Sequence, residues 1–147
     1  MAGSYITGLT ALCIPHPGRH KPLWHHFGPP DRWQIAGADY PDTSFLFGNR
    51  ELVDLTETFA LWGIEPPLCV SASYERAVFD LLFFYVEKEG RVVPNVQPSD
   101  IDDVVDFQIV VDWIKQWEQA GQLQRGQSMR DWLNPKNPWV AMQKDYL

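Results

Sequence analysis

Residues 71–90 read SASYERAVFDLLFFYVEKEG and predict one long, largely buried helix. Ser71 or Ser73 can cap its start, and Gly90 can stop it after Glu89. The second half, residues 81–86, is apolar on every side, which is typical of a helix covered by its neighbours. This stretch therefore predicts a mainly helical core.

Helical spacing recurs on both sides of this segment. One apolar series follows Asn49, a plausible N-cap, and stops at Gly63; its members are Leu52, Leu55, Phe59 and Trp62. A second series follows Ser99 and Asp102, which have the spacing of a capping box, and stops at Gly121. We therefore expect three principal helices, over about 50–62, 72–89 and 100–120.

The two ends of the chain have a different character. Residues 1–48 are rich in Pro, Gly and His, and we expect strands over 5–14, 33–36 and 44–47 joined by ordered loops. Ser128 and Asn137 are expected to open a short C-terminal helical segment. The sequence thus predicts an α+β, mainly helical, single domain over 1–147, with a strand-loop segment (1–48) and a helical body (49–147).

Charge is unevenly distributed along the chain. The formal net charge is −7, yet the first 34 residues carry +2. The remaining acidic body repels phosphate backbones and attracts basic proteins. Direct binding to nucleic acid is therefore not expected, whereas a basic or nucleic-acid-handling protein is a suitable partner.

The cysteines and the hydropathy pattern bear on the compartment. Cys13 and Cys69 do not make a disulfide framework, so we expect reduced thiols in the cytoplasm. No apolar stretch approaches the roughly 20 residues that span a bilayer. We therefore expect no membrane association.

All four histidines, His16, His20, His25 and His26, fall within one short stretch after Cys13. Imidazole and thiolate are donors that zinc prefers, so a metal site is one interpretation. The prolines exclude a helix that would bring these ligands together, and the favoured alternative is a Pro-rich loop packed on Trp24 and Trp33. We therefore expect no cofactor, with zinc as the alternative.

Cys13 also suggests a nucleophile. His16 or a more distant histidine would be its base, and Arg19 and Lys21 would favour the thiolate. The sequence signatures that accompany catalytic cysteines are missing, and the common nucleotide-binding and hydrolase motifs are missing as well. Enzymatic activity is therefore not the favoured interpretation.

Carboxylates gather where the helix over about 100–120 begins. Asp100, Asp102, Asp103 and Asp106 suit the helix dipole, and the last three also make a candidate docking edge. On the preceding helix Phe79 and Phe83 lie near a polar stripe that includes Asp80 and Glu87. If that stripe is exposed, these side chains form a partner-binding surface, with Trp113 at the border of the next helix; if other elements cover the helix, they belong to the core.

These observations favour a non-catalytic protein-binding inhibitor or adaptor, of the immunity, antitoxin or anti-defence type, with an acidic and aromatic surface. One alternative is a small metal-dependent or Cys/His enzyme centred on Cys13 and His16–His26. Another is a structural subunit of a larger assembly.

Overall fold

The computed structural model describes residues 4–19 and 33–134. Within these ranges it contains seven α-helices, one π-helix and a two-stranded antiparallel sheet, and so confirms the α+β class. The elements run, in order, α1 (Gly8–Ala11), α2 (Ser44–Phe47), β1 (Leu52–Asp54), α3 (Thr56–Trp62), β2 (Val70–Ala72), α4 (Tyr74–Leu82), η1 (Phe83–Lys88), α5 (Pro98–Ile101), α6 (Phe107–Gln119) and α7 (Gly126–Leu133).

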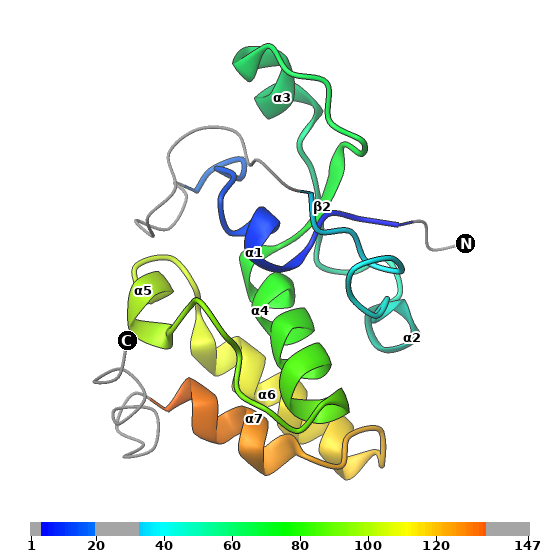
Figure 1. The fold of residues 1–147 in the computed structure, drawn as a ribbon, viewed down its shortest axis with the longest axis vertical. Coiled ribbons are helices and arrows are strands. Elements are labelled where there is room, and N and C mark those ends of the chain that lie inside the picture. The colour runs from blue at the N-terminus through cyan, green and yellow to red at the C-terminus, as the bar shows by residue number, and fades with distance from the viewer. Residues whose placement is uncertain (1–3, 20–32, 135–147) are drawn as a thin grey trace.

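Helix α4 is the central element of the structure (Figure 1). The Ser73 hydroxyl accepts the Arg76 N–H at 3.1 Å and caps the helix, as the sequence predicts. Every residue from 71 to 83 is buried, so the prediction of a covered helix is confirmed. The last turns widen into the π-helix η1, and Gly90, with φ of +66°, follows its end.

The prediction of three long helices is wrong in its details. Residues 52–54 form a strand because they pair with β2, which leaves α3 to begin at Thr56. Residues 102–106 interrupt the helix expected over 100–120, and the capping box at its start uses Gln97 and Asp100 instead of Ser99 and Asp102. Gly63 does end α3, in the left-handed conformation.

The N-terminal segment contains little of the strand structure expected there. Residues 44–47 form helix α2, and within 5–14 only Ile6 makes isolated bridges, to Ile35 and Ser71, before α1 begins. Gly8 has φ of +60°, and a Cβ atom there would lie 2.6 Å from Tyr40, so this turn requires glycine. Helix α7 begins before Ser128, and the helix expected from Asn137 lies outside the described residues.

A two-stranded stem carries α3 away from the other helices. Strands β1 and β2 pair in antiparallel register, with Leu52 opposite Ala72 and Asp54 opposite Val70. Figure 1 shows α3 at one end of the long axis and helices α6 and α7 at the other. We call residues 51–72, which comprise β1, α3, β2 and their connections, the acidic arm, for the charges described below.

A search of the described ranges finds no helix that is both long enough and apolar enough to cross a membrane.

Candidate functional site

Three of the predicted partner-binding side chains are part of the core. Phe79, Asp80 and Phe83 are buried, so the alternative that they belong to the core holds, and their assignment to a partner-binding surface is wrong. Phe79 packs edge-on against Phe47 and Trp117 and stacks on Phe83. The stripe does not face solvent along its length, because Asp80 and Arg76, four residues before it, are buried, although Glu87 is partly exposed.

Asp80 is the centre of a buried hydrogen-bond network that joins three segments. Its carboxylate accepts the hydroxyls of Tyr5 (2.8 Å), Thr7 (2.7 Å) and Thr43 (2.7 Å). Burial raises the pKa of Asp80 to about 6, although the three hydroxyls and the nearby Arg76 charge oppose this shift. These bonds hold the N-terminal segment and the start of α2 against α4.

Arg76 makes the matching contacts one turn earlier on α4. Its guanidinium lies over the rings of Tyr5 (4.2 Å) and Phe47 (4.6 Å) and donates to the Arg50 carbonyl at 2.8 Å. Its Nε has no hydrogen-bond partner among the described residues. Arg76 thus holds the backbone after α2, and Asp80 holds the N-terminal segment, so both residues have structural roles.

Glu87 also has a structural role, as a capping group. Its carboxylate accepts the backbone N–H groups of Gln124 (3.0 Å) and Arg125 (2.7 Å), just before α7. Carboxylates stabilise a helix N-terminus in this way. The structure therefore assigns Glu87 to the contact between η1 and α7.

His16 and Cys13 are both buried. The His16 ring stacks on Tyr74 with 4.0 Å between ring centroids. Burial lowers the pKa of His16 to about 4, so its imidazole is neutral. The Ala11 carbonyl opposes this shift, because it favours the protonated ring. Neither ring nitrogen makes a hydrogen bond within the described part of the chain.

The wider histidine cluster cannot be assembled from the described residues. His20, His25 and His26 lie outside them. Across 4–19 and 33–134 there is no group of three or more His, Cys, Asp or Glu side chains that could hold a metal ion. Cys13 and Cys69 are not joined by a disulfide.

Arg19, which the sequence suggests as an activator of Cys13, instead pairs with Glu75. The two side chains make a double hydrogen bond of 2.9 and 2.8 Å, and Glu75 also accepts the Asp106 N–H at 3.0 Å. Burial alone would raise the pKa of Glu75, but these hydrogen bonds and the Arg19 charge outweigh it and leave the pKa lowered. The pair joins the N-terminal segment to α4 and the start of α6.

The predicted acidic edge is at the surface. Asp102, Asp103 and Asp106 are exposed between α5 and α6. Asp106 also caps α6, since its side chain accepts the Gln108 N–H at 3.1 Å. Trp113 is half-buried and packs edge-on against Phe47 at 4.9 Å, so only part of its ring is open to a partner.

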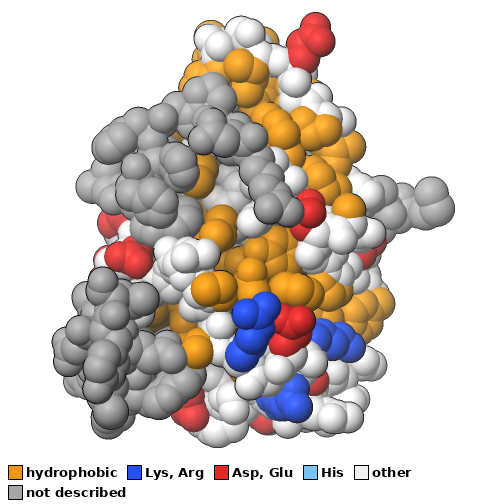
Figure 2. Space-filling model, viewed as in Figure 1, with side chains coloured by type: hydrophobic (Ala, Val, Ile, Leu, Met, Phe, Trp, Pro, Cys, Tyr) orange, Lys and Arg blue, Asp and Glu red, His pale blue; other side chains and the backbone are white. Residues whose placement is uncertain are grey.

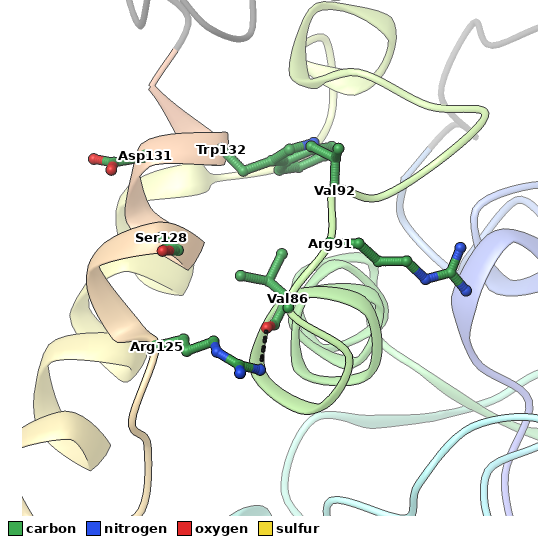
Figure 3. Close-up of a pocket in the computed structure, with 8 residues that line it drawn as sticks. Val86, Arg91, Val92, Arg125, Ser128, Asp131 and Trp132 are labelled. Atoms are coloured by element: carbon green, nitrogen blue, oxygen red, sulfur yellow. Dashed lines mark hydrogen bonds between the residues drawn. The ribbon is translucent and has the colours of Figure 1, made fainter.

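A pocket of about 720 Å³ lies between η1 and α7 (Figure 3). Val86, Val92 and Trp132 supply apolar lining, and Arg125 donates to the Val86 carbonyl at 3.4 Å and the Glu87 carbonyl at 2.9 Å. Ser128 and Asp131 line it from α7, but their side chains point away from Val86 in Figure 3. No Cys or His is among the described lining residues.

The acidic arm carries the most exposed large apolar side chain of the described residues. Leu61, on α3, is 82% exposed, the highest value among the large apolar side chains. Trp62, Ile64 and Leu68 are half-buried beside it, and Val70 is exposed. Figure 2 shows hydrophobic side chains over this end of the molecule, whereas the Lys and Arg side chains visible on that face lie in its lower half.

The charge of the arm has one sign. Residues 51–72 carry Glu51, Asp54, Glu57 and Glu65 and no Lys, Arg or His. Asp54 is engaged locally, since it accepts the N–H and the hydroxyl of Thr56 at 2.9 and 2.6 Å, and these bonds lower its pKa. Glu57 and Glu65 are exposed.

Sequence analysis did not identify the arm as a site. The helical spacing of Leu52, Leu55, Phe59 and Trp62 predicted a helix with this side packed in the core. It did not predict a role for Leu61, which lies on the opposite side of α3. The signal that could have found it is the run from 51 to 75 without a single cation, which contains a Leu-Trp pair.

Comparison with known proteins gives no relative: no family model matches the chain, and neither does a curated protein or a solved structure.

Proposed function

We propose that this protein is a non-catalytic binding protein, an inhibitor or adaptor of the immunity, antitoxin or anti-defence type, which acts by covering part of another protein. The observation that carries the proposal is the acidic arm, where exposed apolar side chains and carboxylates share one projecting element that has no Lys, Arg or His of its own. Large exposed apolar groups ringed by charge are typical of protein interfaces. The exposed Asp102 and Asp103 provide a second acidic surface on the same molecule.

The partner in this proposal is a basic protein, including one that handles nucleic acid, because the carboxylates can take the places of phosphates. The net charge of −7 favours such an encounter and disfavours direct contact with nucleic acid or with anionic lipid. The two cysteines, Cys13 and Cys69, form no disulfide with each other, which supports a cytoplasmic location.

Affinity purification of the tagged protein from the cells that encode it tests this proposal. We expect a stoichiometric complex with one protein, which can be rebuilt from purified components and which changes the activity of that partner. If the purified chain recovers no stoichiometric protein, the proposal fails. A uniform assembly of many copies would favour the structural-subunit alternative.

His16 favours one second candidate, the metal-dependent or Cys/His enzyme. A buried neutral imidazole with two unpartnered nitrogens has a lone pair available to a metal ion. Metal analysis of protein purified without a His-tag separates the candidates. Stoichiometric zinc that is lost together with stability in chelator would support this one, and zinc-free protein of unchanged stability would exclude the zinc version.

A further inference from the structure

The acidic arm has a charge pattern that selects its partner. Leu61 projects from α3 with Glu57 four residues before it and Glu65 four residues after it, and the whole arm has no cation. A partner surface that covers Leu61 must also lie beside Glu57, one helical turn earlier on α3, and Glu65 is exposed in the connection that follows the helix. A purely apolar partner surface would leave the carboxylates of Glu57 and Glu65 poorly solvated. Lys or Arg side chains at the border of that partner surface would pair with these carboxylates.

The arm is also held in place before any partner binds. Phe59, on the opposite side of α3 from Leu61, is buried and packs edge-on against Trp33 with 5.6 Å between ring centroids. Gly63 ends the helix, and Pro66 and Pro67 restrict the chain that returns to β2. Little conformational freedom is lost when such an element docks, so its exposed side can contribute fully to affinity.

Two other occupants fit the arm less well. A second copy of the chain would place two sets of four carboxylates together with no cation from either arm. Nucleic acid and anionic membranes carry the same sign of charge as the arm. Charge complementarity therefore favours a basic protein surface.

We propose that the acidic arm docks Leu61 onto an apolar surface bordered by Lys and Arg side chains on a partner protein. This inference rests on the proposed binding function and names the surface and the partner chemistry. Leu61 supplies the apolar anchor, and Glu57 and Glu65 supply register and charge selection.

A defined probe tests the inference: a fluorescently labelled amphipathic peptide of Leu and Lys, compared with its Leu/Glu and Ser/Lys counterparts. We expect the full chain to bind the Leu/Lys peptide in preference to both others, and more weakly as salt rises. Leu61→Ser should weaken binding by about tenfold or more, and the double variant Glu57→Gln/Glu65→Gln by several-fold.

Matched controls locate the effect. Phe45→Ser removes another exposed apolar side chain (61% exposed), and Asp112→Asn removes an exposed carboxylate of α6; both should bind like the wild type. Any of three results would overturn the inference: the wild type and Leu61→Ser bind equally, the Leu/Glu peptide binds as well as the Leu/Lys peptide, or no peptide binds.

Two further outcomes are informative. Sedimentation should show a monomer, and a dimer that Leu61→Ser abolishes would identify a second copy as the occupant and overturn the inference. A stoichiometric partner that binds Leu61→Ser and the wild type equally would leave the proposed function standing and remove only the arm as its contact.

Discussion

The Tyr5 hydroxyl donates to the Asp80 carboxylate at 2.8 Å, across 75 positions of sequence and in the buried interior. Asp80 is one turn after Arg76 on α4, and the two residues hold the N-terminal segment and the chain around α2. They give the body a buried polar network that fixes which segments pack against α4.

The first prediction concerns this network. Asp80→Ala leaves three buried hydroxyls without their shared acceptor, so the free energy of unfolding should fall by about 2–4 kcal/mol. Tyr5→Phe removes only one donor and should cost about 1 kcal/mol. Urea unfolding measures both. Asp112→Asn is the exposed control, and a comparable loss there would contradict the prediction.

The second prediction concerns His16 and acid. Because the pKa of His16 is about 4 in the folded protein, against an ordinary value of 6.5, the unfolded chain binds more protons between these values. The His16 contribution to stability is therefore complete above about pH 6.5 and is lost as pH falls toward about 4. His16→Phe keeps the stacking on Tyr74 and should lose less stability than the wild type between about pH 7 and about pH 4.5 in urea unfolding.

The third prediction is that the contribution of Asp80 to stability changes with pH in the opposite direction to that of His16. Its folded pKa of about 6 lies above the ordinary value of 3.8, so its proton stabilises the fold at low pH and that contribution is lost as pH rises through about 6. The cause is burial, which outweighs the three hydroxyls that donate to the carboxylate and favour its ionised form.

Asp80→Asn should therefore lose more stability than the wild type on acidification over the same range. Identical pH profiles for His16→Phe, Asp80→Asn and the wild type would show that neither group titrates as described.

The fourth prediction compares two ion pairs. Glu75→Gln removes a buried carboxylate that accepts hydrogen bonds from the Arg19 guanidinium and the Asp106 N–H. The free energy of unfolding should fall by about 1–3 kcal/mol. Glu89→Gln removes the partner of Arg91 at the surface and should cost less than about 1 kcal/mol. Thermal or urea unfolding distinguishes them, and equal losses would argue against a structural role for the buried pair.

The fifth prediction separates the two sides of α3. Phe59→Ala should destabilise the protein by about 3–5 kcal/mol, since Phe59 is buried. Leu61→Ser should change stability by about 0.5 kcal/mol or less, because the side chain lies in water. A large loss of stability in Leu61→Ser would mean that Leu61 packs within the fold and is not available to a partner.

Sequence reasoning succeeded where a local signal decided the structure. Ser73 caps α4, Gly63 ends α3, and residues 81–83 and 86 of the apolar run are buried, because capping and the left-handed glycine depend on nearby residues. Residues 44–47 were wrongly expected to form a strand, since tertiary contacts around Arg76 overrode their apolar, β-prone composition.

The candidate surface could not be predicted for a different reason. A polar stripe normally marks the solvent side of a helix. Here Arg76 and Asp80 instead make internal hydrogen bonds to residues far away in the sequence, up to 75 positions for Asp80 and Tyr5. Periodicity does not contain that information. The exposure of Leu61 likewise depends on β1 and β2 pairing to form a stem, which apolar spacing in 50–62 does not reveal.

The central claim is that the acidic arm contacts a partner protein, and site-specific photocrosslinking in the native cell tests it most directly. A photoreactive residue placed at Leu61 should crosslink in high yield to one protein, through a segment rich in Lys and Arg. The same residue placed at Phe45 or Ile109, which are exposed outside the arm, should not. Crosslinking of a partner at Phe45 or Ile109 with none at Leu61 would contradict the claim.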